Sequence, residues 1–360
     1  MVESITIKDI AREAGVSTAT VSYVINDTRP VMPEKRQRVL DVIAKTDYQP
    51  NRVAKSLRTK RTNTIGVLAE DILAFPSARV INGISEYVED TEYQILLYNL
   101  RLMDSLHNQY DHIVYNSDKI NKALSLLIYG ANVDAVIYIG MFDRDVSGVV
   151  TDIKKPLVIA YSTSNDENTF SVSYENEEVS AELTRHLISN GHKHIAVITG
   201  LAHTPPAQMR MRGITKAFRE AGLILDSAFV KNGDWERESG YNCMKDILQQ
   251  EGKMPTAVIA MNDTMAISAM DAIRDAGLRV PEDISVVGFD NREVSDLIFP
   301  RLTTVEIDLE SIGRKAAKMT NQLLKNSSGD QLLPSEHNIV IPSKLILRDT
   351  VSNCAHRTMK

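Results

Sequence analysis

Residues 7 to 26 encode a short helix, a one-glycine turn and a second helix, and this pattern constrains the chain more than any other stretch. In the first segment, apolar residues recur at helical spacing, at Ile7, Ile10, Ala11 and Ala14. Gly15 ends that helix, because a residue without Cβ takes a positive φ easily. Ser17 is suited to cap the second helix. The buried face of the second helix is formed by Val21, Val24 and Ile25.

The opposite face of the second helix indicates what the pattern is for. It carries Thr18, Ala19, Ser22 and Tyr23, and in a helix-turn-helix this face enters the major groove of DNA. A third helix is predicted over residues 33–46, where Pro33 opens the first turn. Its buried residues are predicted to be Val39, Leu40 and Ile43. The three helices predict a small DNA-reading domain; a helical hairpin within a larger core is the alternative.

The charge of the chain is unevenly distributed. Residues 1–62 hold 12 basic and 7 acidic residues, a net charge of +5, and the remainder holds 29 basic and 40 acidic residues, a net charge of −11, so that the whole chain carries −6. A stretch without acidic residues, between Tyr48 and Asn63, contains Arg52, Lys55, Arg58, Lys60 and Arg61. A basic arm on an acidic body is typical of proteins that bind phosphate groups of DNA. A solvated linker is the alternative.

Further motifs follow the helix-turn-helix in order. They are Tyr48-Gln49-Pro50-Asn51, the pair Ala54 and Leu57, Ile65-Gly66-Val67, Gly191-His192, Arg210 with Gly213, Asn262-Asp263, the run from Gly277 to Asp290, and Leu302-Thr303-Thr304-Val305. With this order and spacing the chain resembles the lactose-repressor (LacI/GalR) family of bacterial transcription regulators, from about residue 5 to about residue 350. The resemblance implies a repressor that binds near-palindromic operator DNA as a homodimer and responds to a small-molecule effector.

The resemblance also implies which residues contact DNA. We expect Thr18, Ala19 and Tyr23 to meet base edges in the major groove. Phosphate contacts are assigned to Ser17, Thr20, Asn26 and Arg29. Thr6 and Ser22 complete the set in this domain. A hinge helix is expected to order on DNA and to enter the minor groove with Asn51, Ala54, Leu57 and Arg58, where Leu57 is the wedge between base steps. Tyr23 stands where many relatives have arginine, so the operator is expected to differ from theirs.

From Thr64 onward, strand and helix patterns alternate. Apolar runs fall at 64–69, 94–98, 133–139, 156–161, 194–199, 256–260 and 284–289. Helical stretches lie near 79–91, 118–129, 175–190, 208–221, 237–250 and 262–276. This alternation predicts parallel sheets covered by helices on both faces. The predicted fold class is an all-α helix-turn-helix domain followed by an α/β, periplasmic-binding-protein-like effector domain of two parallel-sheet subdomains.

The predicted domains are residues 1–50 for DNA binding, 51–62 for the hinge helix and linker, 63–350 for effector binding and dimerisation, and 351–360 for a tail. The family resemblance implies that the chain crosses between the subdomains three times, near Ser173, Val305 and Leu333. The N-subdomain is thus expected to comprise about 63–173 and 307–332, and the C-subdomain about 174–305 and 333–350.

Candidate effector contacts follow from the rule that ligands of parallel α/β sheets bind at the carboxyl ends of the strands. Trp235, the one tryptophan, follows a strand and a turn, and its ring suits stacking on a sugar or base, although a core position is the alternative. Arg210 opens Arg-x-x-Gly near a helix start and offers a fork of donors. Asn262 and Asp290 each end an apolar strand, whereas Asp263 is expected to cap the next helix. Further candidates are Asp71, Phe75 and Tyr161.

One aromatic plane beside amide, carboxylate and guanidinium groups favours a neutral sugar or small glycoside as effector, with a purine as the alternative. A transporter-type sugar-binding protein would lack residues 1–61 and would need an export signal. An enzyme is not expected, because no phosphate loop, nucleophile motif or dinucleotide fingerprint occurs in its required context. Cys243 and Cys354 show no metal-ligand spacing, and no metal or cofactor is expected. Without a signal peptide or membrane-length apolar run, a cytoplasmic location is expected.

Overall fold

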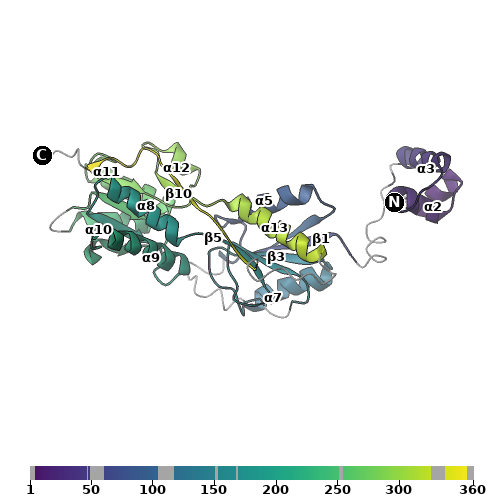
Figure 1. The fold of residues 1–360 in the computed structure, drawn as a ribbon, viewed down its shortest axis with the longest axis horizontal. Helices are drawn as coiled ribbons and strands as arrows, with labels where there is room; N and C mark the ends of the chain where they lie inside the picture. The colour runs from purple at the N-terminus through teal and green to yellow at the C-terminus, as the bar shows by residue number, and fades with distance from the viewer. Residues whose placement is uncertain are drawn as a thin grey trace. The chain divides into compact units, whose positions relative to one another are not determined.

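The computed structural model describes residues 5–46, 48, 61–103, 117–150, 153–167, 169–250, 254–325 and 337–354. The chain divides into two compact units, residues 1–63 and 64–360 (Figure 1). Within the described ranges, no helix has both the length and the apolar character needed to cross a membrane.

The first unit is a bundle of three helices, α1 (Ile7–Ala14), α2 (Thr18–Asn26) and α3 (Pro33–Thr46). Gly15 ends α1 with φ 63°, and its N–H donates to the Arg12 carbonyl at 3.3 Å. The helices share a core of Ile10, Ala11, Ala14, Val21, Val24, Val39 and Val42. The predicted helix-turn-helix with a third helix is confirmed.

One predicted core residue of this unit is wrong. Val39 and Val42 are buried, but Leu40 is 41% exposed. Successive residues are separated by about 100° around a helix, so Leu40 lies on a different side of α3 from Val39. Val42, three positions along, returns to the face that contacts α1 and α2 and takes the core position instead.

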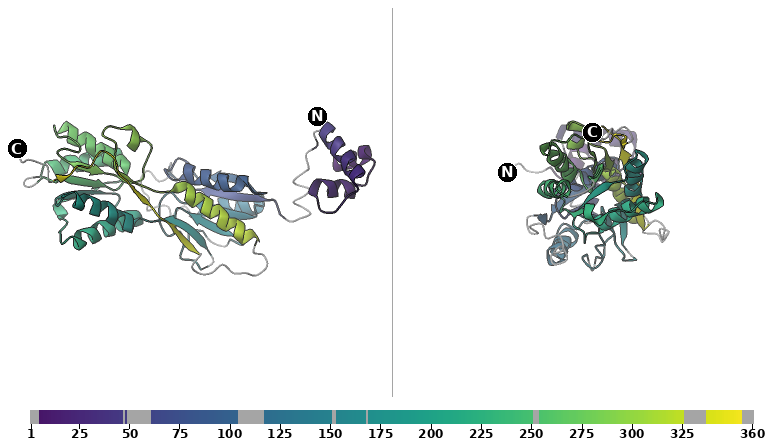
Figure 2. Two further views of the ribbon diagram at one scale, coloured as in Figure 1. Left: turned by 45° about the horizontal axis from the view of Figure 1, so that its top comes forward. Right: turned by 90° about the vertical axis from the view of Figure 1, so that its left-hand side faces the viewer.

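The second unit contains two lobes, each built on a parallel sheet (Figure 2). The sheet of the first lobe has the strand order β11-β5-β4-β3-β1-β2. Its strands are β1 (Thr64–Ala69), β2 (Gln94–Asn99), β3 (Ala135–Ile139), β4 (Leu157–Ala160), β5 (Phe170–Tyr174) and β11 (Asn338–Ile341). One face packs on α5 (Ser77–Glu89) and α13 (Leu309–Lys325), and the other on α7 (Ser117–Ser125), which continues as a π-helical turn (Leu126–Gly130). Both faces are covered, as a parallel sheet requires.

The sheet of the second lobe has the strand order β7-β6-β8-β9. Its strands are β6 (Ile195–Thr199), β7 (Val230–Asn232), β8 (Ala257–Ala260) and β9 (Ser285–Val287). The helices of this lobe are α8 (Glu177–Ser189), α9 (Pro205–Glu220), α10 (Arg237–Leu248), α11 (Asp263–Asp275) and α12 (Val294–Leu297), with a 3₁₀ turn at Ser227–Phe229. The α/β architecture of two parallel sheets that the sequence predicts is therefore present.

Three chain segments connect the lobes. The first leads from β5 to α8, the second contains β10 (Thr304–Glu306), and the third joins β11 to β12 (Lys344–Ile346), which pairs antiparallel with β10. The sequence places the third crossing near Leu333, which lies outside the described residues. Asn338–Ile341 still pair with β5, so the chain leaves the first lobe only after Ile341. The prediction that these residues belong to the second lobe is therefore wrong. The strand they pair with, β5, lies far away in the sequence, so the local pattern could not reveal the pairing.

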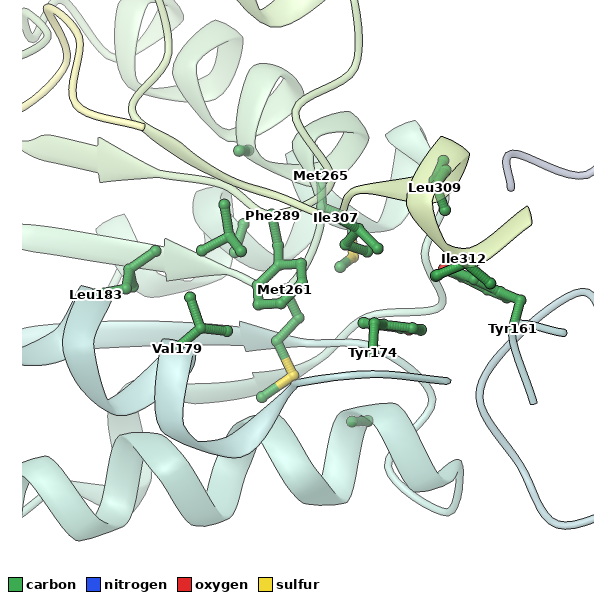
Figure 3. Close-up of a cluster of buried hydrophobic side chains, with 14 of the residues drawn as sticks. Tyr161, Tyr174, Val179, Leu183, Met261, Met265, Phe289, Ile307, Leu309 and Ile312 are labelled. Carbon is green, nitrogen blue, oxygen red and sulfur yellow. The ribbon is translucent and has the colours of Figure 1, made fainter. Parts of the chain in front are cut away.

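A single apolar core runs through the junction of the two lobes (Figure 3). Tyr161 and Tyr174 come from the ends of first-lobe strands, and Met261 and Phe289 from the ends of second-lobe strands. Leu309 and Ile312 of α13 pack in the same cluster. Helix α13 has no counterpart among the predicted helices. The shared packing places the carboxyl ends of both sheets next to each other.

Helices α5 and α13 approach so closely that two glycines are needed at their contact. A Cβ built on Gly83 would lie 2.1 Å from the Glu310 carbonyl oxygen, and one on Gly313 would lie 2.1 Å from the Val80 carbonyl oxygen. Both obstacles are backbone atoms, so neither can be relieved by a side-chain rotation.

We predict that Gly83→Ala lowers the free energy of unfolding by about 1–3 kcal/mol, because the helices must separate to admit the methyl group. Gly130→Ala is the matched control, since a Cβ there meets nothing within 4 Å. The control is expected to leave stability unchanged or slightly higher. Urea denaturation followed by circular dichroism measures both; equal losses at the two positions would contradict the packing argument.

Candidate functional site

Side-chain hydrogen bonds stabilise the start of each helix of the helix-turn-helix. Ser17 Oγ accepts a hydrogen bond from the Thr20 N–H at 3.1 Å and lies 2.9 Å from the Thr20 hydroxyl. Thr6 donates its N–H and its hydroxyl to the Asp9 carboxylate at 3.0 and 2.6 Å, which fixes the start of α1. Any phosphate contact by Thr6, Ser17 or Thr20 would therefore come in addition to these hydrogen bonds.

The face of α2 opposite the core is open to solvent at its start. Thr18 and Ala19 are exposed, and Ser22 and Tyr23 are half-buried. The guanidinium carbon of exposed Arg29 lies 5.4 Å from the centre of the Tyr23 ring, a cation–π contact that places a positive charge beside the ring. The structure does not describe the side chain of Asn26. The hinge residues Asn51, Ala54, Leu57 and Arg58 also lie outside the described residues.

A cavity of about 370 Å³ lies between the two lobes. It is lined by Leu73, Ala74, Phe75, Pro76, Met103, Met141, Phe142, Tyr161, Tyr174, Thr204, Pro206, Arg210, Trp235, Glu236, Asn262, Thr264, Asp290 and Arg292. These residues follow the carboxyl ends of strands from both sheets, where ligands of such folds bind. The structure thus brings together the predicted residues Phe75, Tyr161, Arg210, Trp235, Asn262 and Asp290.

Asp71 is not among the residues that line the cavity. Its carboxylate accepts hydrogen bonds from the N–H groups of Leu73 and Met103 at 2.9 and 3.0 Å. These bonds shape the loop after β1, which carries Leu73 and Phe75 to the cavity. The sequence indicated a polar residue at a strand end, but the backbone around Asp71 uses both of its oxygens.

Three residues of the cavity wall have strained backbone conformations. Tyr161, Trp235 and Asp290 have φ values of 63°, 76° and 111°, a region that is unfavourable for residues with a Cβ by about 1–3 kcal/mol. The Trp235 ring lies against Gly200, where a Cβ would be 2.0 Å from the ring. Strained conformations persist where the surrounding structure holds them, and they cluster at functional sites.

Arg210 is at the centre of a buried polar network. It is 3% exposed, and its Nε donates to Asn176 Oδ1 at 3.0 Å. Its two terminal nitrogens donate to the Met261 carbonyl and, at 3.5 Å, to the Tyr174 hydroxyl. The Asp290 carboxylate lies 3.8 Å from it. The network gives the guanidinium a protein partner at each nitrogen.

Asn176 extends this network into the first lobe. Its amide N–H donates to Asp143 Oδ2 at 3.1 Å, while its Oδ1 accepts from Arg210. Asp143 follows β3 of the first lobe, and Asn176 precedes α8 at the start of the second. Asp143 and Asn176 are both buried, so this hydrogen bond joins the lobes beside the cavity without competition from solvent.

Asn262 lines the cavity and also takes the helix-capping role that the sequence predicts for Asp263, which was wrong. Asn262 caps α11, because its Oδ1 accepts from the Met265 N–H at 2.8 Å, and its amide N–H donates to the Trp235 carbonyl at 2.8 Å. Asp263 instead accepts from the Arg292 N–H at 2.7 Å and the Thr304 hydroxyl at 2.5 Å. Asn262 has the extended backbone of an N-cap, with φ −153° and ψ 167°, which sequence alone does not reveal.

Several wall residues have no counterpart in the predicted set. Met141 and Phe142 follow β3, Tyr174 ends β5, and Arg292 follows β9 two positions after Asp290. Their positions at or just after the ends of strands are the sequence feature that could have identified them as cavity residues. Tyr174 stacks on Tyr161 with ring centres 4.7 Å apart, a contact between two neighbouring strands.

Two buried carboxyl groups near the cavity have raised pKa values. Burial raises the pKa of Asp143 to about 7, against the opposing effects of Arg210 and the Asn176 hydrogen bond. Burial, assisted by the charge of Asp290, raises the pKa of Asp263 to about 7. Both groups bind a proton more tightly in the native state than in the unfolded chain, where aspartate titrates near pH 4. Their contribution to the free energy of unfolding is therefore full below about pH 4 and is lost as the pH rises through about 7.

We predict that Asp143→Asn makes this loss of stability between pH 4 and 7 shallower, because the asparagine binds no proton. Asp246→Asn, on the exposed side of α10, is the matched control and should leave the pH dependence unchanged. Denaturation curves recorded at intervals across this range test the prediction. A wild-type slope in Asp143→Asn would show that Asp143 is not protonated in the native state.

Comparison with known proteins gives matches over both units. Residues 6–51 match the family described as bacterial regulatory proteins, lacI family, and residues 184–351 match the periplasmic binding protein-like domain. The chain is 33% identical over 349 residues to the HTH-type transcriptional repressor PurR of Pasteurella multocida (strain Pm70), a match that covers 97% of this chain and 99% of that protein.

Solved structures of regulators are similar to this chain over nearly its whole length, as two examples show. The lac repressor dimer bound to operator and the anti-inducer ONPF matches with a TM-score of 0.78 at 26% identity, over 97% of this chain and 100% of that one. The transcriptional regulator CelR in complex with cellobiose matches with a TM-score of 0.65 at 25% identity, over 96% of this chain and 99% of that one.

Proposed function

The chain belongs to the lacI family of bacterial regulatory proteins, and we propose that a small molecule in the cavity between its lobes sets its affinity for operator DNA. Membership makes the protein a DNA-binding transcriptional repressor with an effector-type α/β domain. The observation that carries the proposal is the cavity, which is lined by aromatic side chains and by residues with strained backbone. The same chain has a helix-turn-helix whose second helix, α2, exposes Thr18 and Ala19 to solvent. Because its operator is genomic DNA, the protein is proposed to act in the bacterial cytoplasm.

We assign DNA reading to α2. Thr18, Ala19 and Tyr23 are the proposed base-contacting residues, and Ser17, Thr20 and Arg29 the proposed phosphate contacts. The exposure of Thr18 and Ala19 and the charge of Arg29 beside Tyr23 support this assignment. The insertion of the hinge residue Leu57 into the minor groove stays a prediction.

A sugar-sized molecule with a ring is the proposed effector, with a purine as the alternative. Phe75, Phe142, Tyr161 and Trp235 line the cavity, and aromatic faces stack on the flat sides of sugars and bases. A volume of about 370 Å³ is in the range of small-molecule sites. The complex of the similar regulator CelR with cellobiose supports a sugar.

We propose that the protein acts as a homodimer. Exposed apolar side chains are present on both lobes: Leu96, Leu97 and Tyr98 on the sheet-edge strand β2, and Val294, Leu297 and Phe299 at α12. Apolar surfaces and unpaired strand edges of this kind are typical of protein interfaces. The segment near residues 79–92 is a further proposed part of the interface. The lac repressor structure similar to this chain is described as a dimer.

We predict that Trp235→Ala and Asp290→Asn reduce the effect of the ligand on operator affinity at least tenfold while leaving ligand-free operator binding within about threefold. Each substitution removes a cavity contact in the second unit and leaves the first unit unchanged. Operators selected from random DNA, with gel shifts in the presence of candidate ligands, provide the measurement. Loss of ligand-free operator binding in folded variants would contradict the separation of cavity and reading helix.

We predict that Tyr23→Arg changes the preferred operator half-site, because arginine donates a bidentate pair of hydrogen bonds to guanine that tyrosine cannot make. Thr46→Ser, at the end of α3, is the control and should leave the preference unchanged. Selected binding sites are sequenced for the three proteins. Identical sites for wild type and Tyr23→Arg would mean that Tyr23 does not face the bases.

A further inference from the structure

One cationic side chain in the cavity wall has a donor that the protein does not use. Arg292 lines the cavity with 37% of its side chain exposed. Its Nε is buried and has no hydrogen-bond partner among the described residues. An oxygen of the Asp290 carboxylate is 3.7 Å away, too far for a hydrogen bond. Because a buried, unbonded N–H is unfavourable, a ligand oxygen that reached it would be bound strongly.

Arg292 is also held in position before any ligand arrives. Its guanidinium carbon lies 4.5 Å from the centre of the Phe75 ring. Phe75 belongs to the first lobe and Arg292 to the second, so this contact joins the two lobes. Its backbone N–H donates to the Asp263 carboxylate at 2.7 Å. Preorganisation of this kind reduces the entropy lost when a ligand binds.

Two other polar side chains that the sequence indicated, Asn262 and Arg210, already have partners in the protein. Both ends of the Asn262 amide bond to the backbone. Each nitrogen of the Arg210 guanidinium donates to an oxygen of the protein. These bonds use three of the five N–H donors of a guanidinium and one of the two of an amide, whereas Arg292 Nε has no hydrogen-bond partner among the described residues.

The charges around the cavity favour an anion. The two guanidinium groups of Arg210 and Arg292 face one buried carboxylate, Asp290. Glu236, the other acidic residue of the wall, is exposed. Behind the wall, the pKa values of Asp143 and Asp263 are raised to about 7, so at neutral pH these groups carry only part of a negative charge. Over the whole wall the two guanidinium groups are matched by two carboxylates, but the Glu236 carboxylate is exposed to solvent, so guanidinium groups outnumber carboxylates only among the wall side chains that are not exposed.

We propose that the effector carries an anionic group, a carboxylate or a phosphate, and that Arg292 binds this group while the ring of the effector lies against the aromatic wall. A guanidinium binds either anion through two parallel N–H donors. The inference rests on the proposed function and replaces the expected neutral sugar with an acidic or phosphorylated one.

Probes that share a ring and differ in the anion test this. Binding of glucose, glucuronate, glucose 6-phosphate and inorganic phosphate to the full-length protein is measured by isothermal titration calorimetry at constant ionic strength. At least one of the anionic sugars is expected to bind more tightly than glucose, and which one does separates carboxylate from phosphate. Inorganic phosphate is expected to compete with glucose 6-phosphate if phosphate is the group bound.

Variants connect the preference to one residue. Arg292→Gln is expected to weaken the preferred anionic probe at least about tenfold, and Arg292→Lys, which keeps the charge without the fork, to weaken it less. Arg274→Gln, on the exposed surface of α11, is the matched control and should bind like the wild type. Thermal unfolding checks that all three variants are folded.

The inference is overturned if neither anionic sugar binds more tightly than glucose, or if Arg292→Gln binds the anion as the wild type does. The inference is also overturned if the ligand that controls operator binding is neutral and binds equally to the wild type and to Arg292→Gln. In that case the proposed control by a small molecule is still valid. The proposed function itself fails on a different result, a ligand that occupies the cavity without changing operator affinity.

Discussion

The buried charge of Arg210 is the constraint on which the arrangement of the second unit depends. A guanidinium that is 3% exposed must be surrounded by acceptors, because an unpaired buried cation is strongly unfavourable. The acceptors come from separate parts of the chain: Asn176, Met261 and Tyr174. Meeting this one requirement brings the ends of β5 and β8, one from each lobe, to a common point, and the cavity forms beside it.

The same requirement links the two lobes. The Asn176 side chain accepts a hydrogen bond from Arg210 of the second lobe and donates one to Asp143 of the first lobe. The residue that pairs with the buried cation therefore also connects the two lobes. A ligand that interacts with Arg210 or Asp290 therefore acts next to the hydrogen bond between the lobes. A ligand shifts an equilibrium only when it binds two states with different affinities, and this proximity gives such a difference a structural basis.

Local features of the fold could be predicted from sequence, and features that depend on distant partners could not. The turn at Gly15 and the cap at Ser17 are determined by neighbouring residues, and both are present as predicted. Strand-end positions identified Trp235 and Asp290 as cavity residues. The capping of α11 by Asn262 instead of Asp263 depends on backbone angles, and the unbonded donor of Arg292 depends on which acceptors its neighbours place near it. Helix α13, which has no counterpart among the predicted helices, nevertheless carries a periodic apolar signal at Leu309, Ile312 and Ala316.

The pairing of β11 with β5 has a consequence for synthesis of the protein on the ribosome. Chains emerge N-terminus first, so nearly half of the chain is translated after β5 ends at Tyr174 and before β11 begins at Asn338. During that interval the nascent sheet has an open edge at β5, and the helix α13 that covers one of its faces is also missing. The first unit needs none of these later residues, because its core lies within residues 10–42. A growing chain thus carries a complete DNA-reading unit before the unit that would control it exists.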